Sequence, residues 1–163
     1  MSLRLPLLVK PTSPASSIPR MVPLLLIPLL FLASCAVSFV APYDEVFDRQ
    51  VSEFHQETAV FLARMLSTRG TYAANRTFYA EADGTIEVLR SRASLYDEKK
   101  NAGTLQQLAL LEQAFDDVAE IHRAGPMVGD GYRAVRNTLS VHFRALLQIE
   151  LHKKNSAAVS APH

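Results

Sequence analysis

The chain has 163 residues, 48% hydrophobic and 20% charged, and its 17 basic and 16 acidic side chains leave a formal net charge of +1. This near-neutral balance gives no support for nucleic-acid binding, which relies on a basic surface. The single cysteine excludes an intramolecular disulfide and the paired cysteines of c-type haem attachment.

The first 35 residues show the three regions of a bacterial export signal in their usual order. Positive charge comes first, at Arg4, Lys10 and Arg20, and an uncharged apolar run from Met21 to Leu32 follows it. Small residues then precede the cysteine, as they do at signal cleavage sites. Both Met1 and Met21 are candidate translation starts.

The residues Leu32-Ala33-Ser34-Cys35 match every place of a lipobox, and this segment resembles the precursors of bacterial lipoproteins. The resemblance covers residues 1–35. It implies cleavage between Ser34 and Cys35, a diacylglyceryl group on the Cys35 thiol and acylation of the new amino terminus. Because Ala36 rather than Asp follows the cysteine, it also implies sorting to the outer rather than the inner membrane. Two or more acyl chains bind a bilayer stably, whereas one binds reversibly.

Two alternatives remain for this segment. Met21–Ala41 has no charge over 21 residues, and roughly 20 apolar residues can cross a bilayer as a helix. Pro23 and Pro28 count against a retained membrane helix, since proline is tolerated there but not preferred. The second alternative is an ordinary cleaved signal that leaves Cys35 free or buried.

The expected organisation is a signal peptide at 1–34, a lipidated tether at 35–43, a helical bundle at 44–154 and a disordered tail at 155–163. Arg4, Lys10 and Arg20 leave with the signal, so the remaining 129 residues carry 14 basic and 16 acidic side chains, a formal charge of −2. That length suits one domain with an apolar core, which must be stable without a disulfide.

Helical periodicity begins at Asp44, and no alternating run indicates a strand. The first predicted helix, Asp44–Ser67, has Asp44 as its cap and ends at 68–71, where Gly70 suits a left-handed turn. The second, from Tyr72 to about Lys99, includes Asp83-Gly84, because the apolar phase continues across it. The expected core positions of these two helices are Phe47, Val51, Phe54, Thr58, Phe61, Met65, Tyr72, Tyr79, Ala82, Ile86, Leu89, Ala93 and Tyr96.

The third helix is predicted to open with a capping box at Thr104–Gln107 and to end at Gly125-Pro126. The fourth begins at Asp130 or Gly131 and ends near Lys154. Their expected core positions are Leu108, Leu111, Phe115, Val118, His122, Tyr132, Val135, Leu139, His142, Leu146 and Ile149. Four helices with short connections predict an all-α, antiparallel, up-down-up-down four-helix bundle. Acidic side chains on the third helix and basic ones on the fourth favour their pairing.

Histidines on the apolar stripes are the candidate ligand residues. If His122 and His142 met at one level, they could form a small pocket with Tyr79 and Tyr132 for a ligand, metal or haem. A seam histidine bonded to a neighbouring Glu or Tyr is the commoner arrangement. The Glu-x-x-His motif of di-iron bundles is absent, and the Glu-x-His pairs present place their side chains about 200° apart on a helix. No metal site and no cofactor are predicted.

No catalytic residues are predicted, since the chain lacks a Gly-x-Ser-x-Gly elbow, a P-loop and a dinucleotide fingerprint. We expect a non-catalytic envelope lipoprotein that faces the periplasm and acts as a helical protein-interaction or structural module. Its expected partners are the membrane, through the lipid anchor, and another envelope protein, with no nucleic acid. The alternative is a small-ligand or metal-binding bundle that serves as a sensor or carrier.

Overall fold

The computed structural model describes residues 41–159. Its elements are α2 (Glu45–Thr68), the short 3-10 helix η2 (Ala73–Asn75), α3 (Arg76–Ser94), α4 (Ala102–Ala124) and α5 (Gly129–Val159). The lipobox with its cleavage site at Ser34 and Cys35 lies outside the described residues, as does nearly all of the candidate membrane helix. None of the helices described is long and apolar enough to cross a membrane.

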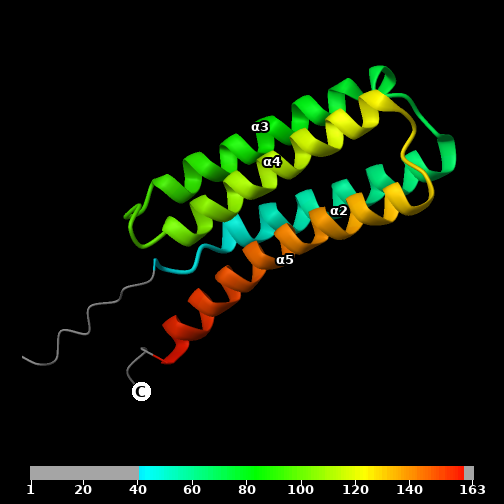
Figure 1. Ribbon diagram of the computed structural model, residues 1–163. Helices are drawn as coiled ribbons and strands as arrows, with labels where there is room; N and C mark the ends of the chain where they lie inside the picture. The colour runs from blue at the N-terminus through cyan, green and yellow to red at the C-terminus, as the bar shows by residue number, and fades with distance from the viewer. Residues whose placement is uncertain (1–40, 160–163) are drawn as a thin grey trace, which may run out of the picture. The chain divides into compact units, whose positions relative to one another are not determined.

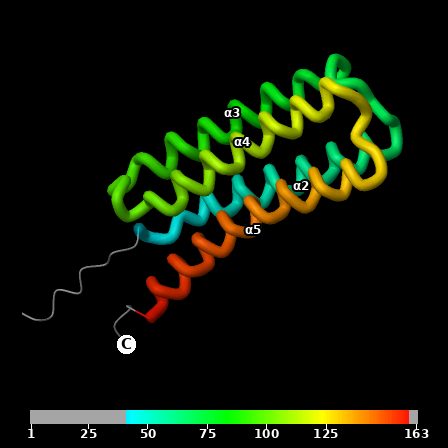
Figure 2. Tube along the Cα trace, in the orientation of Figure 1, coloured from blue at the N-terminus to red at the C-terminus, as the bar shows by residue number. Residues whose placement is uncertain are grey.

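The four long helices form an antiparallel bundle. Each packs against the next one along the chain, and α5 packs against α2, which closes the bundle (Figures 1 and 2). Residues 41–159 contain no strand. The predicted all-α, up-down-up-down four-helix bundle is therefore confirmed.

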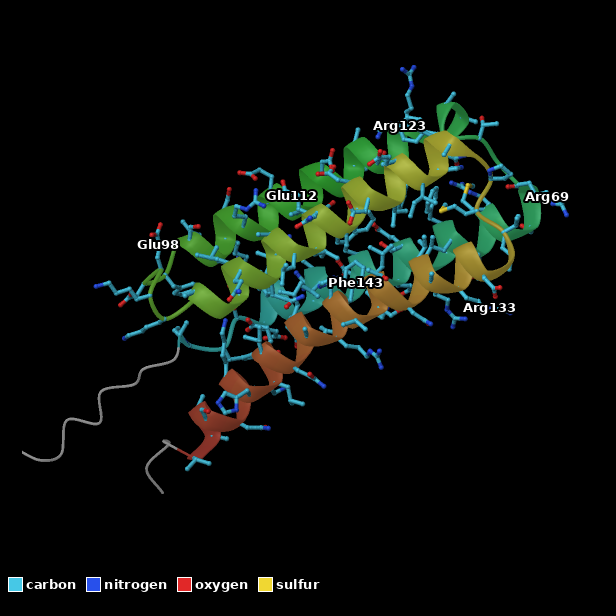
Figure 3. All side chains as sticks on the ribbon, viewed as in Figure 1. Arg69, Glu98, Glu112, Arg123, Arg133 and Phe143 are labelled. Carbon is cyan, nitrogen blue, oxygen red and sulfur yellow. The ribbon has the colours of Figure 1, made fainter. Side chains whose placement is uncertain are left out.

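One continuous apolar core runs between the helices. All six core positions predicted for α2 are buried, and all five predicted for α4 are buried as well. Phe54 stacks on Phe115 with ring centroids 5.3 Å apart, and Phe143 of α5 meets Phe54 edge-on at 5.1 Å. Figure 3 labels Phe143 on α5. These aromatic pairs join α2, α4 and α5 in the middle of the bundle.

The ends of α2 are set by two different devices. At its start, Asp44 Oδ1 accepts hydrogen bonds from the backbone N–H groups of Val46 and Phe47 at 3.0 and 3.1 Å, so the predicted cap is confirmed. At its end, the left-handed residue is Arg69, with φ 51°, and not the expected Gly70. Gly70 is needed for space instead, because a Cβ there would lie 2.9 Å from Asn75 Nδ2.

Two predictions about α3 and α4 need correction. The second predicted helix is shorter than expected, since α3 occupies Arg76–Ser94 and η2 precedes it, but Asp83-Gly84 does lie within one helix. The capping box at Thr104 is wrong. The cap position is Asn101, and Thr104, the third residue of α4, is buried inside its first turn, where its hydroxyl accepts a hydrogen bond from Lys153.

Helix α5 differs most from expectation. It continues to Val159, so a disordered tail is wrong for residues 155–159, while 160–163 lie outside the described part of the chain. A helix that is already packed extends at little cost through alanines such as Ala157 and Ala158, because propagation is easier than nucleation. Its buried stripe also differs by one residue at two positions. Phe143 and Glu150 are buried where His142 and Ile149 were expected.

The predicted charge pairing between the third and fourth helices is also not the one observed. The acidic residue Glu112 of α4 pairs with Arg90 of α3, with Arg90 Nη2 and Glu112 Oε2 2.5 Å apart. Arg133 of α5 pairs with Asp130 of its own first turn. The Arg133 pair is largely exposed and contributes little to stability, whereas the Arg90 pair is partly buried between α3 and α4.

Candidate functional site

His122 lies in the core near the end of α4, with 2% of its surface exposed. Its Nε2 is 2.7 Å from the Gly70 carbonyl oxygen, and its Nδ1 is 2.9 Å from the Tyr79 hydroxyl. A carbonyl can only accept, so Nε2 carries a proton, and in the neutral imidazole Nδ1 then accepts from the Tyr79 hydroxyl. Burial raises the pKa of the Tyr79 hydroxyl, which therefore stays protonated as a donor.

His142 and Tyr132 do not join this pair. His142 is half-buried on α5, and its Nδ1 lies 2.8 Å from Nε2 of Gln107. Gln107 precedes His122 by 15 residues on α4, a separation of about 22 Å along the helix axis. Tyr132 packs on the core at the start of α5. The structure therefore brings Tyr79 and His122 together and places His142 at another level.

A metal or small-ligand role for His122 is not favoured by its surroundings. His122 lines a cavity of about 400 Å³ together with Gly70, Tyr72 and Arg123. Both ring nitrogens, however, are already hydrogen-bonded within the protein. Among residues 41–159, no three His, Cys, Asp or Glu side chains are arranged to hold a metal ion.

A buried polar network at the opposite end of the bundle was missed by the sequence reasoning. Lys153 and Glu150 are 5% and 1% exposed, and Lys153 Nζ donates to Glu150 Oε1 at 2.6 Å. The same ammonium donates to Asn101 Oδ1 at 2.9 Å and to Thr104 Oγ1 at 3.2 Å, so each of its three protons has an acceptor. Because Asn101 and Thr104 belong to the start of α4, this network joins α4 to the end of α5.

Two further bonds extend the network to the other helices. Glu150 Oε2 accepts from the backbone N–H of Asp44 at 3.4 Å, and Asn101 Nδ2 donates to the Ala93 carbonyl at 2.9 Å. The cavity between these groups measures about 10 Å³, room for roughly one water molecule. Groups from all four helices thus meet in a closed polar cluster, which suits a structural role.

Asp44 is also held by Arg92 at the end of α3, with Arg92 Nε and Asp44 Oδ2 2.7 Å apart. Burial alone would raise the pKa of this carboxyl group. The hydrogen bonds from Arg92, Phe47 and Val46 together with the charge of Arg92 outweigh burial, so the pKa lies below its ordinary value. The cap of α2 is therefore an ionised group that binds two helices at once.

A solvent-open groove of about 630 Å³ lies between α2 and α3. Its floor is apolar, and within it Phe61 and Phe78 stack with ring centroids 3.6 Å apart. Val60 projects beside them with 63% of its surface exposed. The cause of this opening lies in the packing, since α2 and α3 contact each other less than the other neighbouring helix pairs do.

The rim of this α2–α3 groove carries an excess of negative charge. Its charged wall residues are Glu53, Glu57, Glu81 and Arg64. Arg64 lies near Asn75, 3.5 Å from its side-chain oxygen. Glu53 Oε1 lies 3.9 Å from Arg49 Nε, but both side chains are more than 60% exposed. Such an exposed pair is weak and screened by solvent, so Arg49 offsets little of the negative charge of the rim. The sequence reasoning missed this groove. The signal that could have indicated it is the apolar residue Val60, which follows Glu53 and Glu57 on the same helix face, at spacings of seven and three residues.

Comparison with protein-family models, with curated proteins and with solved structures finds no match to this chain. Its function therefore has to be inferred from its own residues. Of the features described, the His122 pair and the Lys153 network have their hydrogen bonds satisfied within the protein. The α2–α3 groove, by contrast, presents apolar side chains in a depression that is open to solvent.

Proposed function

We propose that this protein is a lipid-anchored lipoprotein of the bacterial cell envelope whose helical bundle binds another envelope protein and has no catalytic role. The lipobox ending at Cys35 supports the anchor and a location facing the periplasm, and Ala36 after the cysteine supports the outer rather than the inner membrane. The α2–α3 groove is the observation that supports the binding role.

The chemistry of the groove favours an amphipathic helix with basic flanks. A helix that lies in such a groove places apolar side chains on the floor at spacings of three and four residues. Phe61, Phe78 and Val60 would receive them. Lysines or arginines beside that apolar stripe would then face Glu53, Glu57 and Glu81, and opposite charges at a rim favour the correct partner and faster association.

The alternative, a sensor or carrier of a metal or small ligand, is less well supported. It needs free donor atoms on His122 and His142 at one level. Both nitrogens of His122 are hydrogen-bonded to Tyr79 and Gly70, and His142 lies about 22 Å away along the helix direction.

The anchor is tested by mass spectrometry of the mature protein. We expect a mass that corresponds to a chain beginning at Cys35 with acyl groups added. A Cys35→Ser variant should lose those groups and the retention in the membrane fraction. A variant with unchanged membrane retention would contradict the lipid anchor and support a retained span instead.

The groove is tested by photo-crosslinking in intact cells. A photoreactive residue at Val60, in the groove, is compared with one at Val141, which is 53% exposed on α5. We expect Val60 alone to capture a specific protein, through a basic amphipathic segment of that protein. The double substitution Glu53→Lys with Glu57→Lys should reduce capture at least tenfold while leaving the thermal midpoint within about 2 °C. Equal capture at both positions, or capture that ignores the charge reversal, would contradict the proposed site.

A further inference from the structure

The apolar side chains exposed at one end of the bundle are unusually open to solvent. Among the described residues, the two most exposed large hydrophobic side chains are Val159 at 88% and Leu95 at 79%. Leu95 begins the connection between α3 and α4, and Tyr96 beside it is 39% exposed. Val159 ends α5. We name Leu95–Lys100 and the last six residues of α5, 154–159, together the tip.

The tip lies at the end where the chain enters the bundle. Pro42 and Tyr96 line the same small cavity, and Lys154 Nζ is 5.2 Å from the centre of the Tyr43 ring. Beyond Lys153, which is bonded to the start of α4, helix α5 continues for six residues, about 9 Å. Figure 1 shows this red end of α5 extending past the start of α2. In Figure 3, Glu98 marks the α3–α4 connection at this end, and Arg69 and Arg133 mark the opposite one.

From these positions we infer that the tip contacts the lipid surface, with Leu95, Tyr96 and Val159 in the interfacial layer. This inference rests on the proposed anchor at Cys35. Ala41 follows Cys35 by six positions, and six residue steps can span at most about 22 Å. Helix α2 alone is about 36 Å long, so the anchor holds the tip within reach of the bilayer, and the opposite end can reach it only if the bundle lies on its side.

The side chains of the tip suit an interface between water and lipid. Tyr96 combines an apolar ring with a hydroxyl, and such residues gather where one end is apolar and the other wet. Lys99, Lys100 and Lys154 can lay their apolar stems along lipid while their ammonium groups remain at the headgroups. Asp97 and Glu98 offset part of this positive charge. Contact is therefore carried mainly by apolar burial and does not require anionic lipid.

The absence of tryptophan from the chain allows a direct measurement. A single tryptophan is introduced at Leu95 in the tip, at Val88 on the side of α3, or at Val128 near the opposite end. The latter two are 55% and 41% exposed, so they are matched surface controls. The full lipidated chain is reconstituted into phosphatidylcholine vesicles with brominated acyl chains, which quench tryptophan only on close approach.

We expect bromolipid to reduce the fluorescence of Leu95→Trp at least twofold, and that of Val88→Trp and Val128→Trp by less than a fifth. Adding anionic phosphatidylglycerol should leave this pattern unchanged. If the chain co-sediments with the vesicles and Leu95→Trp is not quenched, the tip contact is refuted while the anchor stands. Quenching of Val88→Trp equal to that of Leu95→Trp would mean that the bundle lies on its side, which also overturns the inference. Failure of the chain to co-sediment would overturn both the anchor and the contact.

Discussion

Replacing Lys153 by methionine should destabilise the bundle far more than a typical substitution near the end of a helix. The change keeps most of the side-chain volume but removes the ammonium that donates to Glu150, Asn101 and Thr104. The Glu150 carboxylate would then be buried with only the Asp44 N–H, 3.4 Å away, as a partner. Loss of one member of a buried ion pair costs about 3–5 kcal/mol, because the other charge remains buried and uncompensated.

This cost can be compared with the stability of the whole domain. An unfolding entropy of about 2.1 cal/mol/K per residue over roughly 120 residues converts 3–5 kcal/mol into a fall of about 12–20 °C in the thermal midpoint. Removing both charges, as Glu150→Leu with Lys153→Met, should cost less than either single change, about 0–2 kcal/mol. Replacing a buried pair by apolar groups is often neutral, and here the remaining cost comes from Asn101 and Thr104, which lose their donor.

The assay is urea unfolding of the wild type, both single variants and the double variant, followed by circular dichroism at 222 nm. The free energies of unfolding form a double-mutant cycle, which isolates the interaction between the two side chains. Lys153→Arg is the matched control that retains the charge. If the double variant were destabilised by the sum of the two single effects, the pair would not be coupled and the reasoning would be wrong.

Three further predictions concern single positions. His122→Ala should lower the free energy of unfolding by about 2–4 kcal/mol, because its buried partners lose their hydrogen bonds. His142→Ala should lower it by less than about 1 kcal/mol. Denaturant titration of both variants measures the difference, and equal losses would contradict the prediction. Gly84→Ala should stabilise the protein by about 0.5–1 kcal/mol, because a Cβ there meets nothing within 4 Å. Gly70→Ala should destabilise it, because a Cβ there would lie 2.9 Å from Asn75 Nδ2. Thermal melts that shift both midpoints in the same direction would contradict this prediction. Because the pKa of Asp44 is lowered in the folded state, its stabilising contribution is complete above the unfolded-state pKa of about 3.9 and is lost as pH falls through the folded-state pKa. The variant Asp44→Asn should therefore lose less stability than the wild type on acidification below about pH 4. Urea titrations at stepped pH measure this difference.

The two proposed functions, partner binding in the groove and lipid contact at the tip, use separate surfaces of the bundle. The α2–α3 groove lies along the side of the bundle, while the tip lies at the end where the chain enters. A partner bound in the groove would therefore lie beside the bundle and not between the bundle and the lipid. Substitutions at Val60 and at Leu95 should accordingly affect partner capture and lipid contact independently.

Much of the fold follows from local patterns in the sequence. Phe47, Val51 and Phe54 recur at spacings of four and three, and a helix turns such residues to one face wherever it lies in the protein. The cap at Asp44 and the stop at Gly125 are local as well. Four amphipathic stripes with short connections have few ways to bury themselves other than an antiparallel bundle.

Tertiary structure decided where polar side chains lie. Glu150 and Lys153 continue the spacing of Leu139, Phe143 and Leu146, but a charged pair at the end of a helix is normally solvated, so the pattern alone predicts exposure. Their burial depends on Asn101, Thr104 and Asp44, which come from the starts of two other helices. The burial of His122 was predicted from its place on the apolar stripe, but its hydrogen-bond partners were not, since Gly70 and Tyr79 lie 52 and 43 positions away in the sequence. Periodicity is a property of one segment, whereas the satisfaction of a buried polar group depends on partners that only folding brings together.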